Sequence, residues 1–115
     1  MNLFAEARNG ALVVQVDEAR LDAANAIRFK DQMRDIIAQP AQRVILDMSV
    51  IGFLDSSGLG AVVSVMKMLA PERQLDLAGL TPNVQKVFHL TRMDTVFRIH
   101  ASVSDALAVG MRDAG

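Results

Sequence analysis

A buried strand and the turn that follows it constrain this chain more than any other stretch. Val44, Ile45 and Leu46 are consecutive apolar residues, which predicts a central strand of a sheet that is covered on both faces. Gly52 interrupts the pattern, and Asp-Ser-Ser-Gly at 55–58 comes just before a helical periodicity. Ser and Asp favour helix N-termini because their oxygens accept hydrogen bonds from the first unpaired backbone N–H groups. We therefore expect a strand–turn–helix junction with a hydroxyl at the positive end of a helix, where a phosphate is electrostatically favourable.

The helix after this junction has two apolar stripes at helical spacing. The stripe expected to pack on the sheet contains Leu59, Val62, Val63, Met66 and Leu69. The second stripe contains Ser57, Ala61, Ser64, Val65 and Met68. Lys67 is the one charged residue in the segment from Ser57 to Ala70. A second apolar side either docks a partner, which is the interpretation we favour, or is covered by a neighbouring helix.

The segment Leu54-Asp-Ser-Ser-Gly-Leu-Gly60, following a Val-Ile-Leu-Asp strand, resembles the signature of STAS-domain anti-anti-sigma factors, also called anti-sigma factor antagonists. In that family the second serine of the motif is phosphorylated by a partner kinase that is itself the anti-sigma factor. The matching position in this chain is Ser57. The expected partner-binding residues are Asp55, Ser56, Ser57, Gly58, Leu59, Ala61, Ser64, Val65 and Met68.

Composition predicts one domain. With 115 residues, of which 51% are hydrophobic, the chain can form a substantial core, and we expect a single STAS domain over residues 1–115. The net charge of −1 gives no electrostatic case for binding nucleic acid or an anionic membrane. The absence of cysteine excludes disulfides and thiolate metal sites. Neither a signal peptide nor an apolar run of about 20 residues is present, so we expect a cytoplasmic protein.

The remaining periodicities predict an α/β fold. Expected strands lie at 3–7, 11–16, 44–46, 74–78 and 96–100, and expected helices run from Asp22 to about Gln39, after Ser57, from Pro82, and from Ser102 through Val109. Asn9-Gly10 between the first two strands predicts a hairpin. Later strands joined by helical crossovers should be parallel. This is the order of the STAS fold, an N-terminal β-hairpin and then β-α repeats, giving a mixed sheet packed with about four helices.

Residues from all parts of this pattern are expected to form one core. They are Leu46, Val62, Met66, Leu75, Leu77, Val87 and Phe88.

A receiver domain is one alternative, since Asp47 ends a buried strand as a phosphoacceptor Asp does. A receiver also needs carboxylates at the end of its first strand to hold Mg²⁺. The first two strands here end in Arg8 and Val16, although Asp17 and Glu18 follow. Asp47 is otherwise expected to bond nearby backbone N–H groups.

A serine hydrolase is a weaker alternative. Ser57 lacks the Gly-x-Ser-x-Gly elbow, and nothing places His89 or His100 beside it, although either could approach Asp94. Two histidines without cysteine also argue against a zinc site, and the glycines lack the spacing of a nucleotide-binding loop.

We therefore expect a non-enzymatic regulatory domain without a cofactor of its own. Its expected partners are an anti-sigma factor with serine kinase activity, which phosphorylates Ser57, and a PP2C-type phosphatase that the family resemblance implies. The alternative within the same fold is a STAS subunit of an assembly or transport system in which Ser57 is never phosphorylated.

Overall fold

The strand predicted from the apolar run is the middle strand of a five-stranded sheet in a computed structural model that describes residues 1–110. The strands of this sheet are β1 (Leu3–Arg8), β2 (Ala11–Val16), β4 (Arg43–Asp47), β6 (Gln74–Ala78) and β7 (Arg98–His100), in the spatial order β1-β2-β4-β6-β7. A separate parallel pair consists of β3 (Arg20–Leu21) and β5 (Phe53–Leu54). The helices are α1 (Ala26–Ile36), α2 (Ser56–Leu69), α3 (Pro82–Leu90), the 3₁₀ helix η1 (Met93–Thr95) and α4 (Val103–Ala108).

The predicted strand directions are confirmed. β1 and β2 pair antiparallel, whereas β2, β4, β6 and β7 pair in parallel. The hairpin turn has positive φ at both central residues, 51° at Asn9 and 80° at Gly10, as a type I′ turn requires. The α/β class and the mixed sheet with four α-helices therefore follow the sequence pattern.

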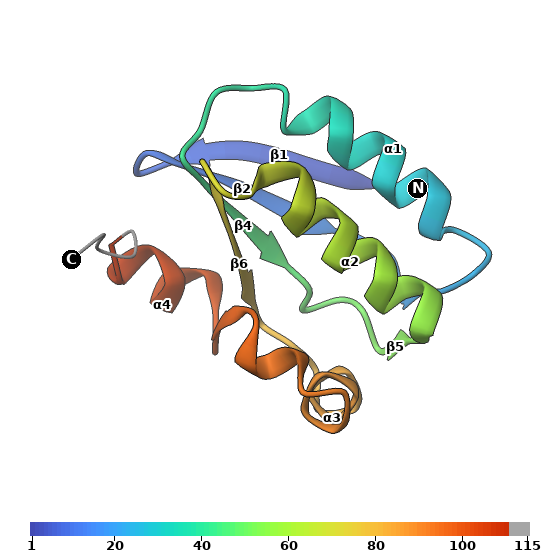
Figure 1. Cartoon of the computed structure of the whole chain (residues 1–115). Helices are drawn as coiled ribbons and strands as arrows, with labels where there is room; N and C mark the ends of the chain where they lie inside the picture. The colour runs from blue at the N-terminus through green and yellow to red at the C-terminus, as the bar shows by residue number, and fades with distance from the viewer. Residues whose placement is uncertain (111–115) are drawn as a thin grey trace.

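The helices lie on both sides of the sheet (Figure 1). α1 and α2 lie side by side over one face, and the larger part of the core fills the space between them and the sheet. α4 lies against the other face, over a smaller apolar cluster that includes Val13, Ile45, Ala78 and Ala106. α3 contacts β5 at one end of the molecule. Because β4 has helices on both sides, its central residues, Val44, Ile45 and Leu46, are apolar on both faces.

Most of the predicted core is correct. Leu46, Val62, Leu75, Leu77 and Phe88 are buried. Met66 and Val87 were also expected to be buried; both pack against this core, but they are only half-buried.

The predicted start of the first helix is also wrong. α1 begins at Ala26 rather than at Asp22, since the Asp22 carboxylate accepts a hydrogen bond from the Ala24 N–H at 3.0 Å and closes a local turn. Asn25 occupies the cap position, and its side-chain oxygen accepts instead from the Asp22 N–H at 2.9 Å. Asp22 therefore shapes the approach to the helix without capping it.

Two other element ends differ from the expectation. α1 ends at Ile36 instead of near Gln39, because the Gln39 N–H bonds to the Ile36 carbonyl in an i→i−3 turn. β7 begins at Arg98 instead of Val96, because η1 precedes it and the Val96 N–H bonds back to the Met93 carbonyl.

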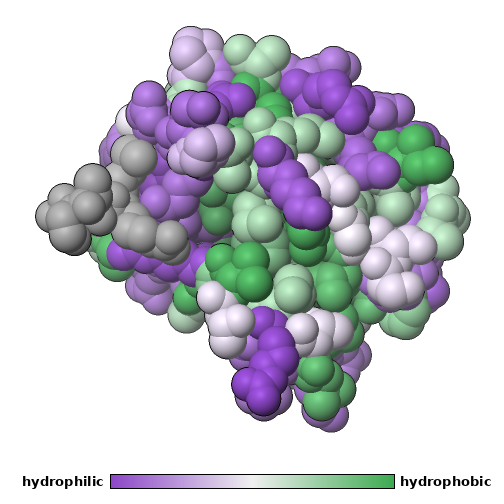
Figure 2. All heavy atoms as spheres, viewed as in Figure 1, coloured by the Kyte–Doolittle hydropathy of each residue, from purple (hydrophilic) through white to green (hydrophobic). Residues whose placement is uncertain are grey.

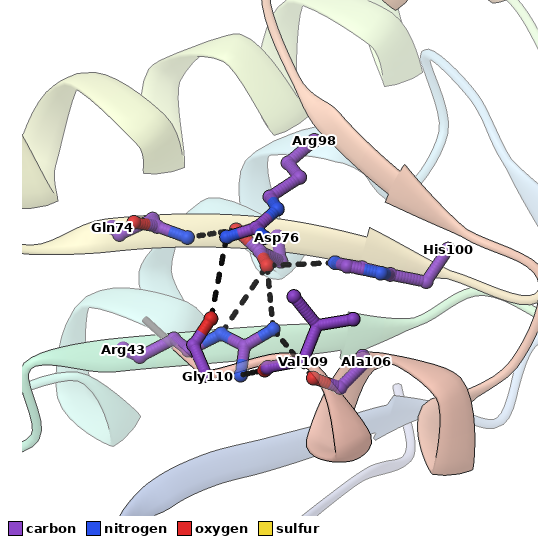
Figure 3. Close-up of polar contacts among 8 residues, drawn as sticks. All are labelled: Arg43, Gln74, Asp76, Arg98, His100, Ala106, Val109 and Gly110. Carbon is purple, nitrogen blue, oxygen red and sulfur yellow. Dashed lines mark hydrogen bonds and ion pairs between the residues drawn. The ribbon is translucent and has the colours of Figure 1, made fainter. Parts of the chain in front are cut away.

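A buried polar cluster between the sheet and α4 was not predicted from the sequence (Figure 3). The fully buried Asp76 carboxylate accepts from Arg43 Nη2 at 2.7 Å, and His100 Nε2 lies 2.8 Å from the same oxygen. Arg43 also donates to the carbonyl oxygens of Ala106 at 2.7 Å and Val109 at 2.8 Å. A cation at the end of a helix interacts favourably with its dipole, so this cluster fastens α4 to the sheet.

We expect Leu46→Ala to destabilise the domain by about 2–5 kcal/mol, since it removes a fully buried side chain from the central strand and leaves a cavity. Urea unfolding checks this value. A loss of less than about 1 kcal/mol would contradict the position of β4 at the centre of the core.

Asp76→Asn should cost about 3–5 kcal/mol at neutral pH, because it leaves the buried Arg43 guanidinium without its counter-charge. Burial raises the pKa of Asp76, but hydrogen bonds from Gln74, Arg43 and His100 outweigh it and hold the pKa below its ordinary value of 3.8. The ionised carboxylate therefore stabilises the fold above that value, and this contribution is lost as the pH falls through the lower folded pKa. In urea unfolding from pH 6 to pH 3, the stability gap between wild type and variant should narrow towards the acid end. If the difference in unfolding free energy between the two proteins stays constant over this pH range, protonation of Asp76 does not account for the loss of stability in acid.

Candidate functional site

The strand–turn–helix junction places Asp55 at the N-cap of α2. Its Oδ1 accepts from the Gly58 N–H at 2.9 Å, and its Oδ2 accepts from the Ala23 N–H at 3.2 Å. The Gly58 hydrogen bond is the largest influence on the pKa of Asp55, which lies below its ordinary value. One ionised carboxylate thus joins the start of α2 to the turn that leads into α1.

A close backbone contact fixes the same junction. Leu21 and Leu54 are paired and buried, and the Asp55 N–H points to the Leu21 carbonyl at 3.4 Å. A Cβ atom at Gly58 would collide with the Leu21 carbonyl oxygen and would lie 2.8 Å from the carbonyl carbon. Glycine at this position therefore allows α2 to begin directly against β3.

Ser57 is the second residue of α2 and is exposed, as is Ser56. The hydrogen bonds that hold the junction come from the Asp55 carboxylate and the backbone. The Ser57 hydroxyl is therefore accessible from solvent at the positive end of a 14-residue helix. Such a hydroxyl can accept a phosphoryl group without losing a structural bond.

The division of α2 into a core stripe and a docking stripe is wrong in part. The buried residues of the helix are Gly58, Ala61, Val62, Val65 and Leu69. Ala61 and Val65 were expected on the docking side, yet they face inward. The half-buried residues are Leu59, Val63, Ser64, Met66 and Met68. The physical reason is that α2 packs against α1 as well as the sheet, so the neighbouring helix covers part of the second stripe.

The surface around this junction has mixed character. Figure 2 shows green and pale green apolar atoms across the middle of one face, with a purple polar side chain lying across them and further purple atoms towards the periphery. Phe53, just before the junction, is 42% exposed. The Arg20 guanidinium lies 4.1 Å from the centroid of the Phe53 ring, and its Nε donates to Asp22 Oδ2 at 3.0 Å.

The family resemblance suggests that the polar loop containing Arg20 lies near the partner surface, but the sequence did not indicate that Asp22 and Phe53 contact Arg20 beside the junction. β3 and β5 have two residues each, too short to show an alternating pattern. The signal available in the sequence was an aromatic residue, Phe53, two positions before Asp55.

The residues of the alternative hydrolase and receiver-type sites do not come together around Ser57. His89 pairs with Asp94 at 3.0 Å, as the sequence allowed, and His100 pairs with Asp76. Asp47 Oδ1 accepts from the Ser49 N–H at 3.0 Å, the structural role expected of a strand-end Asp. Within residues 1–110, no group of three or more His, Cys, Asp or Glu side chains could hold a metal ion. Over the same residues, none of the helices has the length and apolar character needed to cross a membrane.

The structure is thus an α/β domain with a mixed five-stranded sheet and an exposed serine in the first turn of α2, the helix that Asp55 caps. The STAS domain family model matches residues 2–106, and the chain therefore belongs to the STAS-domain family. BtrV of Bordetella bronchiseptica, which carries the name anti-sigma factor antagonist, is 26% identical over 115 residues, covering 99% of this chain and 97% of BtrV.

Two solved structures show the same fold. An anti-sigma factor antagonist from Mycobacterium paratuberculosis superposes with a TM-score of 0.84 at 24% identity, covering 93% of this chain and 91% of that chain. The Bacillus cell fate determinant SpoIIAA in its phosphorylated form gives a TM-score of 0.67 at 23% identity, covering 93% and 97%. The expected fold and family are thus confirmed. STAS anti-sigma factor antagonists are non-enzymatic regulatory proteins, in line with the regulatory class expected for this chain.

Two glycines of α2 provide a matched test of the junction. Gly58→Ala should destabilise the domain by about 1–3 kcal/mol, because the new methyl group meets the Leu21 backbone. Gly60→Ala, where a Cβ meets nothing within 4 Å, should instead stabilise it by about 0.5–1 kcal/mol through helix propensity. Paired urea melts measure both changes, and equal stability of the two variants would show that α2 does not approach β3 so closely.

Proposed function

We propose that this chain is an anti-sigma factor antagonist, and thus a regulator of transcription, that binds an anti-sigma factor with serine kinase activity. Phosphorylation of Ser57 switches the binding off. The observation that carries the proposal is the exposed Ser57 hydroxyl on a helix start that Asp55 and Gly58 hold independently of it. Membership of the STAS family and the names of the relatives support it. A partner system that acts on sigma factors places the protein in the cytoplasm.

The chain supplies the nucleophile of the phosphorylation reaction. Ser57 Oγ attacks the γ-phosphorus of ATP bound to the kinase, and a new O–P bond forms. The bond between that phosphorus and the β–γ bridging oxygen breaks, ADP leaves, and the hydroxyl proton passes to a base of the kinase. ATP and Mg²⁺ belong to the kinase, so this chain needs no cofactor for its part.

The phosphate acts on binding and spares the fold. It adds a charge of about −1.5 to −2 beside the ionised Asp55. The positive end of α2 favours an anion at this position, so the folded domain should tolerate the modification. An interface that covers Ser57 must instead desolvate two neighbouring anions, which opposes binding. A PP2C-type phosphatase would remove the phosphate and reset the switch.

The residues proposed to bind the partner divide into two groups by burial. Those at the surface are Asp55, Ser56, Ser57, Leu59, Ser64 and Met68. Gly58, Ala61 and Val65 are buried, so they support the binding surface by setting the position of α2 and do not contact the partner directly.

Serine variants test this function. Ser57→Asp should keep the melting temperature and bind the kinase more weakly, on the order of 100-fold if desolvating the extra carboxylate costs about 3 kcal/mol. Ser57→Ala should bind and refuse phosphate, whereas Ser56→Ala should still be phosphorylated. The assay mixes each variant with the cognate kinase and labelled ATP and measures both phosphate transfer and complex formation.

Persistent transfer to Ser57→Ala would refute the assignment of this serine. No transfer to the wild-type chain would favour the alternative, a STAS subunit that is never phosphorylated.

A further inference from the structure

Arg20 is held at the edge of the junction by two exposed contacts. Its guanidinium stacks 4.1 Å from the Phe53 ring centroid, and its Nε donates to Asp22 at 3.0 Å. The Arg20 side chain is nevertheless 60% exposed. Cation–π pairs and ion pairs at exposed positions are individually weak, so Arg20 can leave both partners at small cost.

The strand pairing brings Arg20 towards the start of α2. Arg20 pairs with Phe53 and Leu21 with Leu54, and the Leu21 carbonyl abuts Gly58, the neighbour of Ser57. Side chains alternate along a strand, so Arg20 lies on the outer side of β3, opposite to the buried Leu21. The positive charge of Arg20 also helps to lower the pKa of Asp55, which caps α2.

We propose that Arg20 is the internal counter-ion of phosphoserine 57: on phosphorylation its guanidinium leaves Asp22 and Phe53 and binds the phosphate. This inference rests on the proposed phosphorylation of Ser57. Arg20 is a cation that the structure links to this junction, because it donates to Asp22 and its charge helps to lower the pKa of Asp55, the cap of the helix that carries Ser57. A phosphate dianion offers three strong acceptors and can take two N–H groups of a guanidinium at once, which one exposed carboxylate contact does not match.

The exchange of partners by Arg20 would change both the shape and the charge of the docking surface. Phe53 loses the guanidinium stacked on its ring, and Asp22 loses the partner that neutralises it. A partner that recognises the unmodified surface then meets a bare aromatic ring, a free carboxylate and a neutralised phosphate. Arg20 therefore transmits the modification of Ser57 to residues on a different strand.

The first test uses protein with phosphoserine installed at position 57 during translation, so that it does not depend on any kinase. ³¹P NMR titration gives the second pKa of the phosphate in wild type, Arg20→Gln and Arg34→Gln. Arg34 is a matched control, because it is 60% exposed and pairs with Asp31 at 3.0 Å on α1. Loss of the counter-ion should raise the phosphate pKa by about 0.5 unit or more in Arg20→Gln and leave it unchanged in Arg34→Gln. Arg20→Lys should fall between wild type and Arg20→Gln, because it keeps the charge and loses the two-pronged contact.

The second readout follows the side chain itself. In the unmodified protein the Phe53 ring should shift the Arg20 Hδ proton resonances upfield, and phosphoserine 57 should abolish that shift. Identical phosphate titrations in wild type and Arg20→Gln, or an Arg20 resonance that does not move, would overturn the inference. A chain that no cognate kinase phosphorylates, but whose installed phosphoserine binds Arg20, would refute the proposed function and leave this contact established.

Discussion

The contact between the start of α2 and the backbone of β3 determines the rest of the site. Gly58 lets the helix begin against the Leu21 carbonyl, and Asp55 fastens it there through hydrogen bonds to Gly58 and Ala23. This contact fixes the N-terminus of α2, where Ser57 stays at the surface, while packing against α1 and the sheet covers Ala61 and Val65 further along the helix. The accessibility of the serine is thus a consequence of backbone packing one residue away.

Two Arg–Asp ion pairs of this structure differ in burial, and they therefore differ in how easily their partners can separate. Arg43 and Asp76 are 5% and 0% exposed, so separating them would leave a buried charge, and the pair fastens α4 permanently. Arg20 and Asp22 are 60% and 17% exposed, so water can replace either partner and the pair can exchange. Burial, and not the chemistry of the ion pair, decides which of the two can take part in a switch.

Features set by adjacent residues could be predicted from the sequence, and those set by distant contacts could not. The Asn9-Gly10 hairpin, the two-faced apolar strand and the Asp55 cap each depend on a few neighbouring residues. The buried side of α2 could not be predicted from the sequence. The helix is apolar on most sides, and its packing against α1 determines which side is covered. The ion pair of Arg43 with Asp76 joins residues 33 positions apart, and nothing in either local sequence indicates the partner.

A serine in the first turn of a helix suits a reversible switch because the fold and the signal depend on different atoms there. The junction is held by the Asp55 carboxylate and the Gly58 backbone, so a group added to the Ser57 hydroxyl breaks no bond that the fold requires. A phosphate on a buried residue in the middle of a helix would have to be desolvated, and a phosphate at the C-terminus would be repelled by the helix dipole. At the N-terminus the fold would tolerate the anion, and its effect would fall on the surface around it and on whatever binds that surface. The same placement would leave a phosphate on Ser57 exposed, so that a phosphatase could reach it without unfolding the domain.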